Sequence, residues 1–243
     1  MATILITGAG SGFGKAAAIA LTARGHDVIA TTERASQADA LRAEAPDLRV
    51  EQLDITTADV EKVDAWDVDV LIDNAGAGQF GPLAEVPLDI VRHLFEVNVF
   101  GTLAVTQRVL AGMIPRGSGR VIIVSSIAGL IAAPATGPYA MTKHALEAMG
   151  KTMRAELAPL GIDVCLLNPG PYDTGFNDRM AASMWTWFGE DNLQAPTTET
   201  FEMVQAFVTT DQRDPAEVVD KLVELVEAEV TEENNLVPPD VLG

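Results

Sequence analysis

The sequence contains a single cysteine, Cys165, among 243 residues, so no disulfide bond can form within one chain. Cys165 lies in the apolar run 162–167, and we expect it to be a buried and unreactive thiol. The three histidines, His26, His93 and His144, are far apart in the sequence and lack the spacing of metal ligands. We therefore expect no metal site.

Basic residues are also scarce, because 16 Lys and Arg stand against 35 Asp and Glu, giving a formal net charge of −19. Such a charge repels nucleic acid and anionic membranes, so we expect neither as a partner. The apolar runs are short, and none reaches the roughly 20 residues that cross a bilayer. The first residues, 1–4, lack the pattern of a secretory signal. We expect a soluble, cytoplasmic protein, whose acidity is compatible with a saline habitat or simply with solubility.

The chain is 48% hydrophobic, which is enough for one α/β domain with a sizeable core. Strand-like apolar runs alternate with helical patterns, at 3–7, 27–31, 48–53, 68–72, 120–125 and 162–167. This alternation predicts a Rossmann-like, doubly wound parallel sheet with helices on both faces, as a single domain over residues 1–243. The last segment, 234–243, is expected either to add an edge strand or to reach a neighbouring subunit.

A glycine-rich loop, Thr7-Gly8-Ala9-Gly10-Ser11-Gly12-Phe13-Gly14, follows the first apolar run and precedes an alanine-rich helical pattern. A strand, a glycine loop and a helix in this order are typical of a site for nucleotide phosphates, since glycines let backbone N–H groups approach the anion. The alternative is a tight turn that serves only the fold. The context favours the phosphate site.

Tyr139 and Lys143 are four residues apart and share one face of a predicted helix. A nearby ammonium favours the phenolate, so we expect Lys143 to lower the pKa of Tyr139 from its ordinary value of about 10. Ser126 follows the predicted strand 120–125 and is a second hydroxyl for the same reacting oxygen. Taken alone, the pair is more often a half-buried aromatic beside a solvated lysine.

Taken together and in order, these motifs resemble the classical short-chain dehydrogenase/reductase family over nearly the whole chain. The resemblance is carried by Gly8, Gly12 and Gly14, Asp73-Asn74-Ala75-Gly76, Asn98, Ser126, Tyr139-x-x-x-Lys143 and Asn168-Pro169-Gly170. Two features depart from the family pattern. Asp73 stands where the family usually has asparagine, and the stretch 54–73 is shorter than usual, which predicts a truncated helix.

The resemblance implies an NAD(P)(H)-dependent oxidoreductase that transfers a hydride between nicotinamide and a ketone or secondary alcohol. It implies that Tyr139 is the catalytic acid/base, that Ser126 orients the substrate oxygen, and that Lys143 contacts ribose and tunes Tyr139. Asn98 resembles the family's asparagine that holds a water in the proton relay. From the residues alone, Asn98 could equally be a helix asparagine that bonds a backbone carbonyl.

The resemblance also implies the cofactor contacts, which lie at the predicted strand ends. They are Gly8, Ser11, Gly12, Phe13, Gly14, Thr32, Glu33, Arg34, Asp54, Ile55, Asn74, Ala75, Gly76, Tyr139, Lys143, Pro169, Gly170 and Thr174. An acidic residue after the second strand suits the ribose hydroxyls of NAD, whereas arginine suits the 2′-phosphate of NADP. Glu33 and Arg34 offer both, so the choice between NAD and NADP stays open. Asp54 and Pro169-Gly170 could also be turn residues.

The segment at about 174–212 is predicted to be a substrate lid. Its large apolar residues are Phe176, Met180, Met184, Trp185, Trp187 and Phe188. They favour a bulky, weakly polar substrate, and packing into the core or against a subunit is an equal alternative. The resemblance further implies a homodimer or homotetramer built through helices at about 88–114 and 139–159.

Two other functions compete with the oxidoreductase. One is a non-catalytic nucleotide-binding regulatory protein, and the other is a non-redox enzyme on the same fold. The presence of Asn98, Ser126, Tyr139 and Lys143 together argues against a protein without chemistry. Halide elimination would, by the resemblance, be expected with arginine in place of Lys143.

Overall fold

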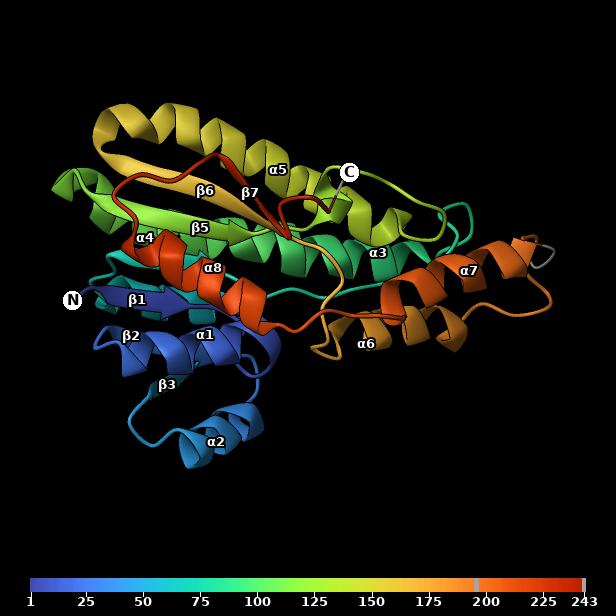
Figure 1. The fold of residues 1–243 in the computed structure, drawn as a ribbon, viewed down its shortest axis with the longest axis horizontal. Coiled ribbons are helices and arrows are strands. Elements are labelled where there is room, and N and C mark those ends of the chain that lie inside the picture. Colours follow the sequence, from blue (N-terminus) through green and yellow to red (C-terminus); the bar gives the residue numbers. More distant parts are fainter. Residues whose placement is uncertain (195–196, 242–243) are drawn as a thin grey trace.

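The computed structural model describes residues 1–194 and 197–241. Within these residues, parallel strands form one sheet in the order β3-β2-β1-β4-β5-β6-β7 (Figure 1). The strands are β1 Thr3–Ile6, β2 Asp27–Thr32, β3 Arg49–Gln52, β4 Val70–Asp73, β5 Gly119–Val124, β6 Ile162–Pro169 and β7 Asn234–Val237. The doubly wound parallel sheet is therefore confirmed, and 234–237 adds the edge strand.

Helices cover both faces of the sheet (Figure 1). The long helices are α1 Gly12–Ala23, α2 Ala35–Glu44, α3 Leu88–Phe95, α4 Thr102–Arg116, α5 Gly137–Leu157, α6 Phe176–Ser183, α7 Thr198–Thr209 and α8 Ala216–Glu227. The short turns are η1 Ala58–Ala65, η2 Glu96–Gly101, η3 Ile127–Gly129, η4 Ala158–Leu160 and η5 Met184–Thr186. Apolar side chains of α1, α2 and α8 share one core cluster, and those of α4, α5 and η1 share a second one on the opposite face of the sheet.

The two cores follow from the alternation of side chains along each strand. Ile4 and Ile6 of β1 face the cluster under α1 and α8, whereas Leu5 faces the cluster under α4 and α5. All three side chains are fully buried, as expected for a parallel sheet with both faces covered. Because every strand runs in the same direction, the loops that follow β1, β2, β4, β5 and β6 converge at one edge of the sheet.

The connection between β3 and β4 contains only the 3₁₀ segment η1, so the truncated helix expected in the stretch 54–73 is confirmed. A longer helical stretch, Leu88–Arg116, runs through α3, the π-helical turn η2 and α4. By length and composition it could cross a membrane, contrary to the expectation that no apolar stretch is long enough. Its apolar window is 44% buried, and α4 packs against β4, β5 and η1 as a core helix.

The segment containing α6, η5 and α7 projects beyond the carboxyl end of the sheet (Figure 1). Met180, Met184, Phe188 and Phe201 are buried there in a third cluster that also contains Tyr139. Packing therefore accounts for several of the large apolar residues of the predicted lid, whereas Trp185 is 40% exposed. Residues 195 and 196 of that lid lie outside the described residues.

Candidate active site

The glycine loop between β1 and α1 passes directly against the loop that follows β4. Gly8 has a φ of +67°, and a Cβ placed on it would lie 2.6 Å from the Cα of Ala75, so only glycine fits. The Thr7 Oγ1 accepts hydrogen bonds from the backbone N–H groups of Asn74 and Ala75, both at 3.0 Å. The Asn74 Nδ2 in turn donates to the carbonyl of Gly8 at 3.1 Å. These bonds hold the two loops together.

The amino end of α1 is open to a ligand. Its N-cap residue, Ser11, makes no side-chain hydrogen bond to the helix, so the first N–H groups have no cap. Uncapped N–H groups and the positive end of the helix dipole attract an anion. Together with the close backbone approach at Gly8, this end of the molecule fits the diphosphate of a dinucleotide.

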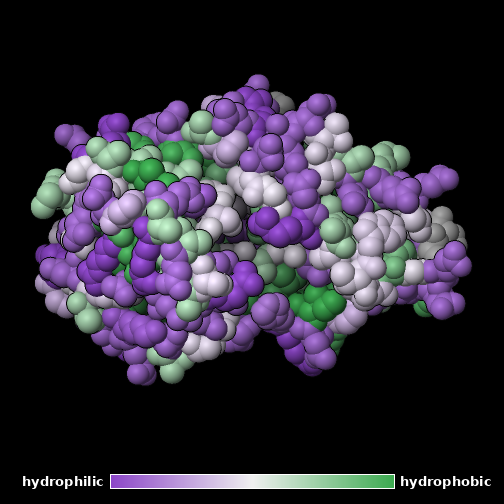
Figure 2. All heavy atoms as spheres, turned by 90° about the horizontal axis from the view of Figure 1, so that it is seen from below, coloured by the Kyte–Doolittle hydropathy of each residue, from purple (hydrophilic) through white to green (hydrophobic). Residues whose placement is uncertain are grey.

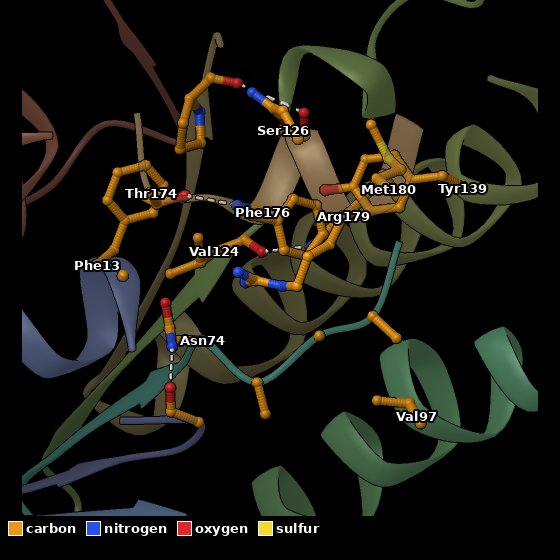
Figure 3. Close-up of a pocket in the computed structure, with 18 of the residues that line it drawn as sticks. Phe13, Asn74, Val97, Val124, Ser126, Tyr139, Thr174, Phe176, Arg179 and Met180 are labelled. Atoms are coloured by element: carbon orange, nitrogen blue, oxygen red, sulfur yellow. Dashed lines mark hydrogen bonds between the residues drawn. The ribbon is translucent and has the colours of Figure 1, made fainter. Parts of the chain in front are cut away.

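A cavity of about 500 Å³ opens at the carboxyl ends of the strands. Most of the predicted site residues line it, namely Gly8, Ser11, Gly12, Phe13, Thr32, Glu33, Arg34, Asp54, Ile55, Asn74, Ala75, Gly76, Ser126, Tyr139, Lys143, Pro169, Gly170 and Thr174. Figure 3 shows Phe13 and Asn74 on one side of this cavity and Tyr139 and Met180 on the other. The structure thus brings together residues separated by up to 166 positions in the sequence, from Gly8 to Thr174.

Two predicted site residues, Gly14 and Asn98, do not line the cavity. A side chain at Gly14 would collide with the Asn74 Nδ2 and would lie 2.9 Å from the Gly8 carbonyl oxygen, so this glycine serves loop packing. Asn98 is fully buried in the π-helical turn η2. Its Nδ2 donates to the carbonyl of Ala77 at 2.8 Å and to the Thr142 Oγ1 at 3.0 Å, and its Oδ1 accepts from the N–H of Ala77 at 2.7 Å.

Asn98 therefore ties the loop after β4 to helix α5 rather than presenting its amide to the cavity. A π-helical turn widens a helix locally and often marks a functional region. Both N–H groups of the amide and one lone pair of its oxygen have protein partners, two of these bonds being to the backbone of Ala77, as expected for a helix asparagine that bonds backbone groups.

The predicted catalytic side chains converge at the start of α5 and the end of β5. The ammonium of Lys143 lies 5.6 Å from the centre of the Tyr139 ring and donates a hydrogen bond to the Val124 carbonyl at 2.8 Å. The Ser126 Oγ accepts from the backbone N–H of Ala128 at 3.1 Å, which fixes its direction. Tyr139 and Lys143 are buried, and both line the cavity. Figure 3 shows the Tyr139 ring at one side of it.

Burial sets the direction of both pKa shifts in this pair. It raises the pKa of the Tyr139 phenol above its ordinary value, and a hydrogen bond with Ser126 lowers it only in part. Burial also lowers the pKa of the Lys143 ammonium to about 8, and the charge of Glu147 opposes that shift. The expectation that Lys143 lowers the pKa of Tyr139 is therefore wrong for this state of the protein. At neutral pH the phenol is protonated and the ammonium is charged.

The charged residues after β2 lie at the far end of the cavity from Tyr139. Glu33 and Arg34 both line the cavity, and both are exposed. The Thr32 Oγ1 donates to the carbonyl of Arg34 at 3.2 Å, which shapes this turn. The Asp54 carboxylate accepts from the N–H and the hydroxyl of Thr56 at 2.9 and 2.7 Å. An acid and a cation stand side by side here, so the geometry leaves NAD and NADP equally open.

Sequence reasoning missed several residues that line the cavity. They are Gln37, His93, Val97, Ile131, Thr136, Arg179, Val204, Phe207 and Val208, among others. Most come from helices whose amphipathic pattern gave no sign of which face meets a ligand.

A glycine loop after the first strand of a parallel sheet, a cavity at the strand ends and a Ser, Tyr and Lys set define a dinucleotide-binding enzyme of the Rossmann type. The family model for short chain dehydrogenases matches residues 2–185. The chain belongs to the classical short-chain dehydrogenase/reductase family.

Known proteins similar to this chain agree with that assignment. An oxidoreductase of Bacillus subtilis, YusZ, is 35% identical over 91% of this chain and 83% of its own length. A 3-ketodihydrosphingosine reductase of Bacteroides thetaiotaomicron is 35% identical over 77% of this chain and 70% of its own length. The structure of an actinorhodin polyketide ketoreductase with NADPH superposes with a TM-score of 0.79 at 27% identity, covering 97% of this chain and 95% of that one.

Membership of this family defines the cofactor class and the reaction class of the protein, and the similar ketoreductase structure at 27% identity contains NADPH. This protein is an NAD(P)-dependent oxidoreductase that transfers a hydride to or from a small molecule.

Proposed function

We propose that this protein reduces bulky, weakly polar ketones to secondary alcohols, and oxidises the alcohols in reverse, with Tyr139 as the acid/base. One observation carries the proposal. Tyr139, Ser126 and Lys143 line the same cavity beside an apolar wall, and burial raises the pKa of the Tyr139 phenol, which keeps it protonated at neutral pH. A neutral phenol is the form that donates a proton to an oxygen gaining negative charge, which suits reduction.

Each member of the catalytic set has a distinct task. The Ser126 hydroxyl donates to the substrate carbonyl oxygen and holds it beside the Tyr139 Oη. The phenol then gives its proton to that oxygen as negative charge develops there. The charged ammonium of Lys143 stabilises the phenolate that remains. Asn98 acts at a distance, because it fixes α5 against the loop after β4.

The bound cofactor, NAD(P)H, supplies the hydride. Residues of the glycine loop, Gly8 and Ser11 to Gly14, would hold its diphosphate, with Gly14 acting through the packing of the loop. Thr32, Glu33 and Arg34 would meet the adenosine ribose, and Asp54 with Ile55 the adenine. The run Asn74 to Gly76 would line the adenosine side. Tyr139 and Lys143 would contact the nicotinamide ribose. Pro169-Gly170 and Thr174 would contact the nicotinamide ring.

The substrate class follows from the wall opposite the glycine loop. That wall is built from Phe176, Met180, Val204, Phe207 and Val208 of α6 and α7. Figure 2 shows an apolar patch beside a hollow at the junction of the main body with the segment that contains α6 and α7. Apolar walls favour ligands with large apolar surface. The names of two similar proteins, a 3-ketodihydrosphingosine reductase and a polyketide ketoreductase, support the same substrate class.

The whole chain, residues 1–243, acts in this proposal as one Rossmann-fold domain, with the substrate lid at about 174–212. We place the enzyme in the cytoplasm, as a homodimer or homotetramer built through α4 and α5. Apolar side chains that remain exposed on this side of the molecule, Phe100, Ile114 and Met141, support a contact between copies.

The test is a titration with NADH and NADPH followed by turnover of ketones that differ in apolar bulk. The chain has only two tyrosines, which provides a matched pair of variants. Tyr139→Phe should lower turnover by at least about 100-fold while the Kd of the cofactor stays within about twofold. Tyr172→Phe should retain turnover, because the Tyr172 hydroxyl donates to Glu217 at 2.8 Å.

Normal turnover by Tyr139→Phe would contradict the assignment of the acid/base. Failure of the wild-type protein to bind either cofactor would favour a non-redox enzyme or a regulatory protein instead. Equal activity on small polar ketones and on bulky apolar ones would contradict the substrate class.

A further inference from the structure

Most cationic side chains of this acidic protein form ion pairs, but a few do not. Within the described residues, every lysine and arginine forms an ion pair with a carboxylate except Arg34, Lys143 and Arg179. All three unpaired cations line the one cavity described above. With 35 acidic residues in the chain, a cation without a carboxylate partner is one that the fold keeps available. The cavity therefore gathers positive charge for an anion.

Arg179 is the cation that sequence reasoning did not find, and it comes from helix α6. Its Nη1 lies close to Gly175, where a Cβ would stand 2.9 Å from it. Gly175 has a φ of +69° and forms the N-cap of α6, so the turn itself favours glycine there. The side chain makes no hydrogen bond to the described residues and extends into the cavity (Figure 3).

Two observations direct Arg179 towards the glycine loop rather than towards the substrate wall. Thr174 begins the same segment, and its Cβ lies 3.4 Å from where a Cβ on Gly12 would be, so the segment rests on the glycine loop. Figure 3 shows the guanidinium reaching to the side on which Asn74 lies, away from Met180. The substrate wall around Met180 is apolar and offers no reason to hold a charge.

We propose that Arg179 binds the diphosphate of the dinucleotide, so that the cofactor is held between the uncapped amino end of α1 and a cation on α6. This inference rests on the proposed dinucleotide site and deepens it. The guanidinium offsets the repulsion between a diphosphate and a protein of net charge −19. Arg179 lies on the segment that also forms the apolar wall. Cofactor binding therefore holds that wall in position before the substrate binds.

The test compares Arg179→Met with Arg92→Met in the full-length protein. Arg92 lies on the surface of α3 in an ion pair with Asp89, so it provides the same change of net charge away from the cavity. Binding of NADPH, NADH, ADP and uncharged adenosine is measured by calorimetry at several salt concentrations. Loss of a charge-assisted contact to phosphate should weaken the Kd of ADP and of the dinucleotides by about 10- to 100-fold in Arg179→Met.

Adenosine affinity should stay unchanged in Arg179→Met, and Arg92→Met should bind every ligand as the wild type does. Arg179→Lys should recover part of the lost affinity, because lysine restores the positive charge but lacks the paired N–H donors of the guanidinium. Equal ADP affinity in wild type and Arg179→Met would overturn the proposal. A change in the KM of the ketone with unchanged ADP affinity would overturn it too, because Arg179 would then act on the substrate. Wild-type protein that binds no dinucleotide would instead overturn the proposed function, and this inference with it.

Discussion

The Thr106 Oγ1 lies 2.7 Å from the Oδ2 of Asp73, at the buried end of β4. The same hydroxyl lies 2.8 Å from the carbonyl oxygen of Thr102, and it has only one proton to donate. A protonated Asp73 that donates to Thr106 satisfies both contacts at once. Burial raises the pKa of Asp73 to about 7, in agreement with a neutral carboxyl. Asp73 thus stands in for the asparagine that the family usually carries here.

Replacing Asp73 by asparagine is expected to stabilise the protein at alkaline pH. In the folded state the carboxyl keeps its proton up to about pH 7, whereas in the unfolded chain it loses it above its ordinary value of 3.8. Wild-type stability should therefore fall as the pH rises between these values and then level off. Asp73→Asn should remove this loss, worth up to about 4 kcal/mol above pH 7. Urea unfolding at pH 5 and pH 8 measures it, and an equal effect at both would contradict the prediction.

Replacing Lys143 by methionine should separate stability from function. Burial lowers the pKa of this ammonium to about 8 from 10.5, so holding the charge destabilises the folded state below pH 8. Lys143→Met should remove a cost of up to about 3 kcal/mol, offset by about 1 kcal/mol for the lost hydrogen bond to Val124. The gain should shrink as the pH rises from 8 to 10.5. Free energies of unfolding of the wild type and of Lys143→Met at pH 7 and pH 10 test this. Under the proposed function, Lys143→Met loses turnover at both pH values.

Two helix glycines should respond in opposite ways to alanine. A Cβ on Gly150 of α5 would lie 2.8 Å from the Leu166 Cδ2, a fully buried side chain of β6. Overpacking there should destabilise the protein by about 1 to 3 kcal/mol despite the better helix propensity of alanine. Gly112 of α4 has no neighbour within 4 Å of such a Cβ, so Gly112→Ala should stabilise by about 0.5 to 1 kcal/mol. Chemical unfolding of both variants measures the difference, and a stabilised Gly150→Ala would refute the packing argument.

Cys165 should be unreactive in the folded protein. Its side chain is buried in β6, and burial raises the pKa of the thiol to about 11, so little thiolate exists at pH 8. An Ellman titration at pH 8 should detect almost no thiol in the native protein and one thiol per chain in urea. Because the chain has a single cysteine, any rapid reaction in the native state would come from Cys165 and contradict the expectation.

The predictable part of this protein lies in local patterns. Apolar runs separated by helical stretches indicated the parallel sheet, and the fold has all six strands predicted from those runs together with the edge strand at 234–237. Tyr139 and Lys143 were found from their spacing, which a helix converts directly into a shared face. The glycine loop was found because its residues are contiguous and its strand and helix are adjacent.

The unpredictable part depends on contacts between distant segments. Asn98 was expected at the proton relay, and only the packing of η2 against the loop after β4 shows that its amide is used by Ala77 and Thr142. Arg179 carries no motif, and its place in the cavity follows from how Thr174, just before α6, packs against the glycine loop. The pKa of Tyr139 depends on how deeply α5 is buried, which spacing along a helix does not contain.

The sequence by itself determined the order of elements, the glycine loop and the set Ser126, Tyr139 and Lys143. Each of these depends on residues that are near neighbours along the chain. Tertiary structure alone decided which cations remain unpaired, which direction each buried pKa shifts and which side chains face the cavity. Each of these properties depends on all the groups that folding brings around a side chain. Desolvation and Coulomb interactions vary with distance in space and not with distance along the chain.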